Sequence, residues 1–229
     1  MKKKIVVFTG AGISKESGVD TFRDAVDGLW ENHKIEEVCT IDGWRKDREK
    51  VLNFYNDRRR QMPTVEPNDA HKALARLEED FDVTIVTQNV DDLHERAGST
   101  NVIHLHGELL KARSTIDTNA IQEWKSDLVL GDLCDKGHQL RPHIVWFGEE
   151  VPNIIPAVEI VKKADVLIIV GTSLNVYPAA GLSHEVKLGT PIYLIDPTEV
   201  NTSNLKNVTH LKLGAGVGLT QLADKLMRR

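Results

Sequence analysis

Short apolar segments rich in valine and isoleucine recur along the chain. Four of them, at residues 5–8, 83–86, 166–170 and 192–195, are mostly flanked by Gly, Asn, Asp or Pro. Apolar runs of this length, bounded by turn-forming residues, are typical of strands that are covered on both faces. We therefore expect four strands in the interior of a parallel sheet.

The segments between these strands show helical patterns. We expect helices at residues 50–61, at 69–79 with Asn68 as the cap, at 179–188 followed by Gly189, and at 219–227. Strands that alternate with helices in this way are typical of an α/β fold. The pattern thus predicts a doubly wound, Rossmann-like parallel sheet.

Two stretches do not follow this alternation. Residues 30–67 have a helical pattern, whereas residues 111–142 are polar and contain few strand signals. We expect both stretches to form a smaller inserted module. The Rossmann-like domain would then comprise residues 1–29, 68–110 and 143–229.

Charge and cysteine content exclude several classes of protein. The formal net charge is −5, so we expect neither nucleic acid nor an anionic membrane as a partner. The longest apolar runs are far too short to span a bilayer, and the basic residues 2–4 precede too short an apolar stretch for a signal peptide. Two cysteines, Cys39 and Cys134, allow at most one disulfide. These features favour a cytoplasmic protein.

A glycine-rich loop follows the first expected strand. Gly10 and Gly12 are spaced as in loops where backbone N–H groups approach a phosphate. The third glycine of the dehydrogenase fingerprint is missing, because Lys15 stands in its place. The loop therefore indicates a nucleotide site and counts against a hydride-transferring dehydrogenase.

Five motifs, in order along nearly the entire chain, resemble the signatures of the sirtuin family. The first is GAGISKESGVDTFR at residues 10–23, and the second is TQNVD at residues 87–91. The third is HLHGE at residues 104–108, and the fourth is RPHIVWFGE at residues 141–149. The fifth combines GTS at residues 171–173 with VYPA at residues 176–179.

The resemblance implies that His106 is the general base. Its neutral imidazole would take a proton from a ribose hydroxyl after the acyl oxygen of the modified lysine has displaced nicotinamide; an ordinary histidine pKa near 6.5 suits this task. Taken alone, His106 would be a strand histidine bonded to backbone. His104, two residues earlier on the expected strand, matches no catalytic position and is interpreted as structural.

The resemblance also implies NAD as a consumed co-substrate. Asn89 and Asp91 match the pair that holds the nicotinamide ribose and carboxamide, although such residues after a strand also suit a helix cap. Asp196 stands where the family usually has Asn, and its carboxylate can still accept from ribose hydroxyls. The complete set of expected cofactor contacts is Gly10, Ala11, Gly12, Ser14, Phe22, Arg23, Trp30, Gln88, Asn89, Asp91, Gly171, Thr172, Ser173, Asp196 and Ala215.

Two further groups of residues match substrate positions of the family. Val145, Trp146, Phe147 and Gly148 resemble the strand edge to which a substrate peptide adds as an extra strand. Tyr55 and Arg58, three apart on an expected helix, resemble the Tyr-x-x-Arg pair of the desuccinylase and demalonylase branch. An arginine fork and a phenol hydroxyl suit a carboxylate, so the pair favours acidic acyl groups alongside acetyl.

The family's structural zinc is not expected here. Sirtuins commonly hold zinc with two cysteine pairs, but this chain retains only Cys134 in that region, with His138 four residues on. A closed structural site needs four ligands, so we expect the metal to be absent; an irregular site built from Cys134, His138 and carboxylates is the alternative. The module would then be held by packing or be mobile, with Ile121, Trp124, Leu128 and Leu130 as the candidate core.

Together these features predict an NAD-dependent protein lysine deacylase. It would remove acetyl, succinyl and malonyl groups from protein substrates and release nicotinamide and an O-acyl-ADP-ribose. Mono-ADP-ribosyl transfer would use the same cofactor and pocket, but it needs no pocket that reads a carboxylate. A non-catalytic NAD or ADP-ribose binding module is the third possibility, and the intact His106, Asn89 and Asp91 weigh against it.

Overall fold

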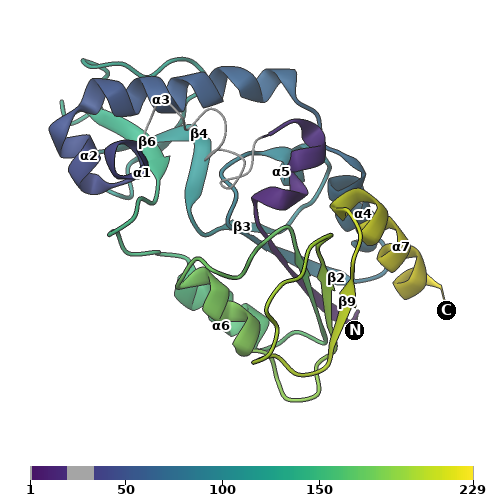
Figure 1. Cartoon of the computed structure of the whole chain (residues 1–229). Coiled ribbons are helices and arrows are strands. Elements are labelled where there is room, and N and C mark those ends of the chain that lie inside the picture. Colours follow the sequence, from purple (N-terminus) through teal and green to yellow (C-terminus); the bar gives the residue numbers. More distant parts are fainter. Residues whose placement is uncertain (1, 20–33, 229) are drawn as a thin grey trace.

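A six-stranded parallel sheet, in the order β3-β2-β1-β7-β8-β9, forms the centre of the larger part of the molecule (Figure 1). The computed structural model describes residues 2–19 and 34–228. All four predicted strands are present, and two short edge strands that the pattern did not reveal flank them. The strands are β1 (Lys4–Thr9), β2 (Asp82–Thr87), β3 (Val102–His104), β7 (Val166–Val170), β8 (Ile192–Ile195) and β9 (Val208–Leu211).

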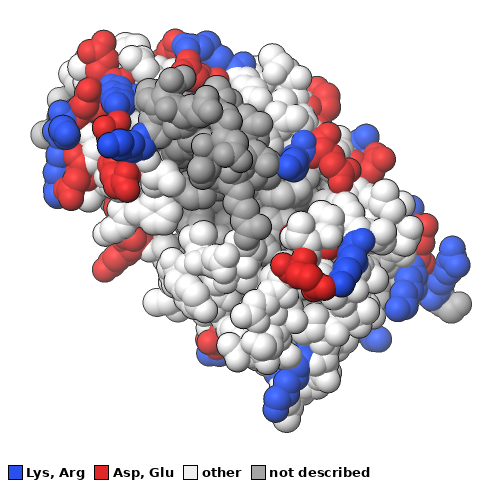
Figure 2. Space-filling model, viewed as in Figure 1, with Lys and Arg blue, Asp and Glu red and all other residues white. Residues whose placement is uncertain are grey.

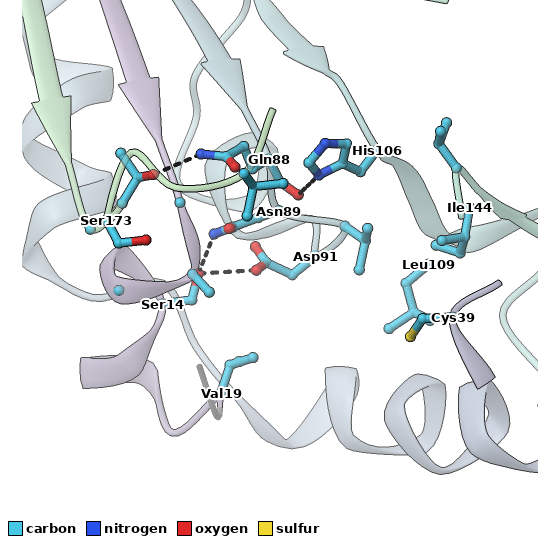
Figure 3. A pocket seen from close by; sticks show the side chains of 18 of the residues that line it. Ser14, Val19, Cys39, Gln88, Asn89, Asp91, His106, Leu109, Ile144 and Ser173 are labelled. Atoms are coloured by element: carbon cyan, nitrogen blue, oxygen red, sulfur yellow. Dashed lines mark hydrogen bonds between the residues drawn. The ribbon is translucent and has the colours of Figure 1, made fainter. Parts of the chain in front are cut away.

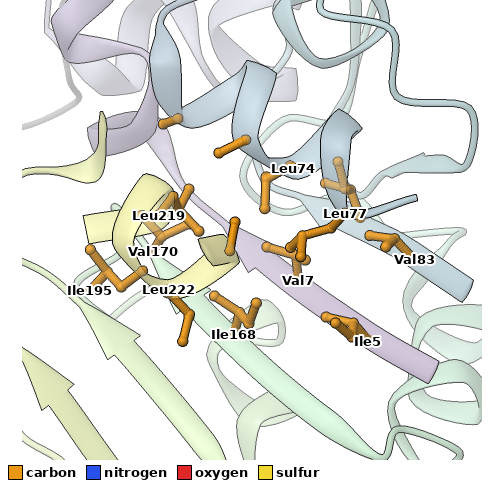
Figure 4. Packing of buried hydrophobic residues seen from close by; sticks show 14 of the residues in the cluster. Ile5, Val7, Leu74, Leu77, Val83, Ile168, Val170, Ile195, Leu219 and Leu222 are labelled. Carbon is orange, nitrogen blue, oxygen red and sulfur yellow. The ribbon is translucent and has the colours of Figure 1, made fainter. Parts of the chain in front are cut away.

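Helices cover both faces of this sheet, which explains the uninterrupted apolar runs. Ile5 and Val7 of β1 pack beneath α4 (Asp69–Leu77) and α7 (Ala215–Met227), as Figure 4 shows. Val6 and Phe8 point to the opposite face, which α6 (Ile154–Val161) and a 3₁₀ helix (Ala179–His184) cover. Each fully buried side chain of this size contributes about 1.5–3 kcal/mol. The predicted doubly wound α/β fold is thus confirmed.

A second sheet, which the sequence pattern did not reveal, forms the smaller part of the molecule. The polar stretch 111–142, with its few strand signals, contributes to an antiparallel sheet in the order β5-β4-β6. These strands are β4 (Gly107–Ser114), β5 (Ile121–Glu123) and β6 (Leu140–Ile144). The register of β4 and β6 shifts between Gly107 and Ala112, and β5 is exposed throughout. A pattern of period two is therefore absent from this part of the sequence.

Helices α1 (Ile35–Val38), α2 (Ile41–Lys46) and α3 (Arg48–Gln61) pack against the second sheet, in agreement with the predicted helical pattern. The core that they share contains Leu128, which is fully buried, and Trp124, which is partly buried. Two other predicted core residues are misassigned, because Ile121 and Leu130 are 44% and 51% exposed. The residue limits of the two parts remain a prediction.

The remaining differences concern helices. Asn68 caps α4 as predicted, its side chain accepting from the N–H of Ala70 at 2.9 Å, but α4 ends at Leu77. The helix expected at residues 179–188 is a 3₁₀ helix that ends at His184. Helix α6 was missed because its sequence IIPAVEIV is apolar except at Glu159, so apolar and polar positions show no clear helical period. Two further short elements are α5 (Leu93–Arg96) and a 3₁₀ turn (Met62–Thr64).

Charged side chains of both signs are interspersed over the end of the molecule that α1, α2 and α3 form, as Figure 2 shows.

Every helix within residues 2–19 and 34–228 is too short or too polar to cross a lipid bilayer.

Candidate active site

The loops that follow β1 and β7 pack directly against each other at the carboxyl edge of the large sheet. The N–H of Gly10 donates to the carbonyl of Val170 at 3.1 Å, and that of Gly12 donates to the carbonyl of Gly171 at 2.9 Å. A Cβ atom at Gly10 or Gly12 would lie 2.7 Å from backbone atoms of Gly171. Glycine is therefore required at positions 10 and 12 because the two loops approach each other closely.

The glycine loop continues as two 3₁₀ turns, Ala11–Ile13 and Lys15–Ser17. The second turn ends at Gly18, which adopts a left-handed conformation with φ of 85°. The carboxylate of Glu16 in this turn accepts from the N–H of Gly216, at the start of α7, at 3.1 Å. The N-terminus of α7 is thus capped by the glycine loop itself.

One cavity of about 860 Å³ gathers the predicted site residues. Its volume falls in the range of pockets that hold nucleotide-sized ligands. Three predicted contacts, Phe22, Arg23 and Trp30, lie outside the described residues. All the others line the cavity: Gly10, Ala11, Gly12, Ser14, Tyr55, Arg58, Gln88, Asn89, Asp91, His106, Val145, Trp146, Phe147, Gly148, Gly171, Thr172, Ser173, Asp196 and Ala215.

Three buried polar side chains form a chain of hydrogen bonds on the cavity wall (Figure 3). The amide of Asn89 donates to Ser14 Oγ at 3.1 Å, and this hydroxyl donates to Asp91 Oδ2 at 3.0 Å. Asp91 Oδ1 also accepts from the N–H of Leu93, the first residue of α5, at 3.2 Å, although the N-cap position of this helix is Asp92. Burial raises the pKa of Asp91, and the hydrogen bonds from Leu93 and Ser14 partly offset this rise. Asp91 therefore lines the site and also holds the start of α5.

His106 lies in the bend between β3 and β4, which corrects its expected position on a strand. Its Nδ1 lies 3.1 Å from the carbonyl oxygen of Gln88 (Figure 3). A carbonyl only accepts, so Nδ1 carries the proton and Nε2 keeps its lone pair. Burial lowers the pKa of His106 below 6.5, which keeps the ring neutral at pH 7. The ring therefore has the protonation state of a base.

The residue after His106 must be glycine. Gly107 has φ of +84°, and a Cβ atom there would lie 2.0 Å from the carbonyl oxygen of His143. Because any larger residue would push β4 away from β6, Gly107 holds the bend that orients His106. Gln88, whose carbonyl contacts His106, also donates through its side chain to Thr172 Oγ1 at 2.9 Å and joins the loops after β2 and β7.

Asp196 and Ala215 lie on the wall that β8 and α7 form. Asp196 Oδ1 accepts from both the N–H and the hydroxyl of Thr198, at 2.8 Å and 2.6 Å. These bonds fix the direction of the carboxylate at the end of β8. Ala215 begins α7, so this wall combines an oriented carboxylate with a small residue.

Tyr55 and Arg58 of α3 line the opposite end of the cavity. Tyr55 Oη accepts from Trp146 Nε1 at 2.9 Å and lies 3.6 Å from Cys39 Sγ. The guanidinium of Arg58 lies 3.4 Å from the centre of the Phe54 ring, and its Nη1 donates to the Phe54 carbonyl at 2.8 Å. Sequence reasoning missed Cys39 at this end, because only the fold brings the end of α1 opposite α3.

Burial is the main influence on the pKa values of the Tyr55 phenol and the Cys39 thiol at this end of the cavity. It raises the pKa of Tyr55 well above 10 and that of Cys39 to about 11. The positive charge of Arg58 acts to lower both pKa values, because it lies at the same end of the cavity as the phenol and the thiol. Phenol and thiol are therefore neutral beside a cation.

The segment 145–148 is not the regular strand that was expected. Strand β6 ends at Ile144, and the chain beyond it makes a single parallel bridge between Phe147 and Thr40. The N–H groups of Val145 and Phe147 donate to the carbonyls of His106 and Cys39, both at 2.9 Å. Phe147 is nevertheless 48% exposed. The segment thus borders the cavity as an anchored but irregular edge.

The described residues of the small module do not fit a structural zinc site. Cys134 and the backbone of His138 belong to one tight turn, and Cys134 Sγ donates to Ser114 Oγ at 3.3 Å. Within residues 2–19 and 34–228, groups of three or more His, Cys, Asp or Glu side chains placed to hold a metal are absent. The expectation of a zinc-free module stays a prediction.

Comparisons with known proteins agree with this geometry. A family model described as the Sir2 family matches residues 10–178. A Helicobacter pylori protein named NAD-dependent protein deacylase is 54% identical over 225 residues, which cover 98% of this chain and 98% of that protein. A Bacteroides thetaiotaomicron protein of the same name is 51% identical over 231 residues, again covering 98% of each.

A solved structure also agrees with membership of the Sir2 family. A complex of a Sir2 homologue with NAD is 42% identical and superimposes with a TM-score of 0.88, covering 98% of this chain and 90% of that one. The chain belongs to the Sir2 family, and the resemblance to sirtuins drawn from its five motifs is confirmed.

Proposed function

We propose that the chain is an NAD-dependent protein lysine deacylase that removes acetyl groups and acidic acyl groups such as succinyl and malonyl. One observation carries the proposal. A single cavity joins the neutral His106 and the Ser14, Asn89 and Asp91 chain to a distant end where Tyr55 and Arg58 lie. The relatives named NAD-dependent protein deacylase support the same activity.

The wall around the glycine loop fits NAD. When bound, NAD supplies nicotinamide as a leaving group and a ribose that receives the acyl group. Asn89 and Asp91 would hold the ribose and carboxamide, since their side chains are fixed by Ser14 and by the N–H of Leu93. The groups toward the adenosine end would be Thr172, Ser173, Asp196 and Ala215.

His106 would act as the base through Nε2. The Gln88 carbonyl holds the proton on Nδ1, so the lone pair of Nε2 is the one available to accept a proton from a ribose hydroxyl. Because burial lowers the pKa of His106, the ring remains neutral at physiological pH. His106 would therefore touch the reacting atoms, and we assign it as the catalytic residue.

The far end of the cavity supports binding of an acyl carboxylate. Arg58 supplies a positive charge there, and the hydroxyl of Tyr55 remains protonated because burial raises its pKa. An acetyl group carries no charge that matches Arg58, whereas a succinyl or malonyl carboxylate would accept hydrogen bonds from both Arg58 and Tyr55.

The acyl-lysine itself would enter beside residues 145–148. Their N–H groups are already used within the chain at Val145 and Phe147, so a peptide would pair with the carbonyl groups of this segment. The exposed ring of Phe147 supplies an apolar surface at the entrance.

The acyl preference is tested with one peptide that carries acetyl-, malonyl- or succinyl-lysine. We compare wild type with Tyr55→Phe, Arg58→Met and the control Arg60→Met, whose side chain pairs with Asp57 and Asp127 on the surface. Loss of the guanidinium at residue 58 should lower kcat/KM for succinyl-lysine by about tenfold to a hundredfold, because a charged hydrogen bond is lost. Acetyl turnover and the control variant should change little. Equal losses for all three acyl groups would contradict a carboxylate-reading role.

A further inference from the structure

Two successive carbonyl groups in the site are each bound by a histidine. The Gln88 carbonyl lies 3.1 Å from Nδ1 of His106, and the Asn89 carbonyl lies 2.8 Å from Nδ1 of His104. The second contact is the shorter one and is buried. The N–H of Asn89 also donates to Thr87 Oγ1 at 3.0 Å, so both backbone groups of Asn89 are held. His104, which matched no role by resemblance, thus contacts a residue of the cofactor wall directly.

The other nitrogen of His104 has a second acceptor. Its Nε2 lies 2.8 Å from Glu95 Oε1, on α5. A neutral imidazole has one N–H group, but both the carbonyl and the carboxylate can only accept. Both hydrogen bonds are satisfied together only when both nitrogens of His104 carry protons. The geometry thus requires an imidazolium, in contrast to the neutral ring of His106.

The surroundings of His104 favour that charge. A small cavity of about 250 Å³ beside it is lined by five acidic residues and two lysines: Asp91, Asp92, Glu95, Glu108, Glu123, Lys111 and Lys125. Lys111 pairs with Glu108 at 2.7 Å, which leaves an excess of negative charge around the ring. Burial acts to lower the pKa of His104, but the hydrogen bond and charge of Glu95 outweigh it and the pKa is raised. The same contact holds the pKa of Glu95 below its ordinary value despite burial.

We propose that His104 is a positioning residue for NAD: as an imidazolium held between Glu95 and the Asn89 carbonyl, it keeps the loop of Asn89 and Asp91 in its binding geometry. The proposal rests on the proposed function, because it assigns His104 to the NAD wall of the same site. Its effect passes through Asn89, whose side chain is linked to Ser14 and onward to Asp91. His104 itself touches none of the reacting atoms.

The contact of His104 with Glu95 and with the Asn89 carbonyl has a specific kinetic consequence. Loss of the charge on His104 replaces its charge-assisted hydrogen bond to the Asn89 carbonyl by a weaker neutral one and loosens the Asn89 loop, which faces NAD and not the acyl group. We therefore expect kcat/KM for NAD to fall while the KM for the acyl peptide, measured at saturating NAD, stays unchanged. A residue with a purely structural role would instead lower the melting temperature without such a split.

The test uses Glu95→Gln, which keeps the size of the side chain and removes its charge, and His104→Gln. Each should lower kcat/KM for NAD by about tenfold, the effect of one charged hydrogen bond. The control variants Glu159→Gln and His184→Gln change exposed residues of the same types and should match wild type. In Glu95→Gln, burial is no longer opposed by the charge of Glu95, so the pKa of His104 should fall and the ring should lose its second proton at lower pH than in wild type.

A spectroscopic measurement tests the charge without turnover. In a pH titration followed by side-chain ¹⁵N NMR, both nitrogens of His104 in wild type should stay protonated to higher pH than in an ordinary histidine, whose pKa is near 6.5. Calorimetry should show weaker NAD binding for Glu95→Gln. A His104 ring that loses its second proton below pH 6.5, or NAD binding equal to wild type in both variants, would overturn the proposal. Absence of deacylation by wild type would instead count against the proposed function, while these two measurements would still decide the role of His104.

Discussion

The side chain of Asn56 exchanges two hydrogen bonds with the backbone of Leu128. Its Nδ2 donates to the Leu128 carbonyl at 2.9 Å, and its Oδ1 accepts from the Leu128 N–H at 2.9 Å. Both groups are buried, and the pairing imitates that of a strand. The contact ties α3 to the loop between β5 and β6, which is the part of the small module where the family commonly has zinc. It thus explains one way in which packing and hydrogen bonds hold this loop.

Replacement of Asn56 by Ala should destabilise the small module. The variant leaves both backbone groups of Leu128 unpaired and removes an acceptor from the buried Arg59, whose Nη1 donates to Asn56 Oδ1 at 2.6 Å. Buried polar groups left without partners cost about 1–3 kcal/mol. We expect a loss of this size in the free energy of unfolding, measured with urea. Asn53→Ala on the exposed side of the same helix is the control, and an equal loss there would contradict the account.

The purified protein should contain far less than one zinc per chain. Two ligands in one turn are too few for a closed site, and Cys134 already donates to Ser114. Metal analysis by mass spectrometry checks this directly, and a chelator should leave the melting temperature unchanged. Cys134→Ser should likewise leave deacylation unaltered. One equivalent of zinc that is lost in Cys134→Ser would show that an irregular site exists.

Acid should destabilise the fold through His71. Burial lowers the pKa of His71 from 6.5 to about 4, so the unfolded chain binds one proton more between these values. The contribution of His71 is therefore complete above pH 6.5 and is lost as pH falls toward 4, by about 1.4 kcal/mol for each pH unit.

His71→Gln removes this titration. Glutamine can still accept from the N–H of Asn68, as His71 Nδ1 does at 3.3 Å. Urea unfolding of the variant between pH 6 and 5 should therefore show a shallower decline than wild type. The exposed His184→Gln should keep the wild-type slope, and identical slopes for His71→Gln and wild type would refute the assignment.

The activity should persist to lower pH than an ordinary histidine base allows. The base form of His106 is neutral, and burial lowers the pKa of this ring, so kcat/KM should begin to fall only below pH 6.5. His106→Ala should lower turnover by about 10²–10⁴-fold and retain NAD binding. An acid limb above pH 6.5, or a variant that binds no NAD, would contradict the assignment of His106 as a base.

The sequence was sufficient for the central sheet because its strands are covered on both faces. Such strands must be apolar at every position, so 166–170 and 192–195 were predicted with their observed limits. The small sheet was missed because its strands do not alternate. The register of β4 against β6 shifts between Gly107 and Ala112, so buried and exposed positions do not alternate regularly along β4. All three residues of β5 are exposed. Local patterns carry no information about such strands, whose pairing depends on contacts distant in sequence.

The candidate site was predicted mainly by motif. Each described residue of the motifs that was expected to contact ligand lines one cavity, but the sequence did not reveal how they are linked. Neither the partner of Ser14 nor the position of Cys39 beside Tyr55 follows from spacing, because 77 and 16 residues separate the two members of these pairs. His104 was interpreted as structural for the same reason, since its partners Asn89 and Glu95 belong to other elements.

The protein is expected to carry out an acyl transfer that consumes NAD and accepts an acidic acyl group. The most direct test of this activity is the stoichiometry of products from a succinyl-lysine peptide and NAD, followed by mass spectrometry. We expect that each succinyl group removed is accompanied by one nicotinamide and one O-succinyl-ADP-ribose. Release of nicotinamide without removal of succinyl, or removal of acetyl groups only from the matching acetyl peptide, would contradict it.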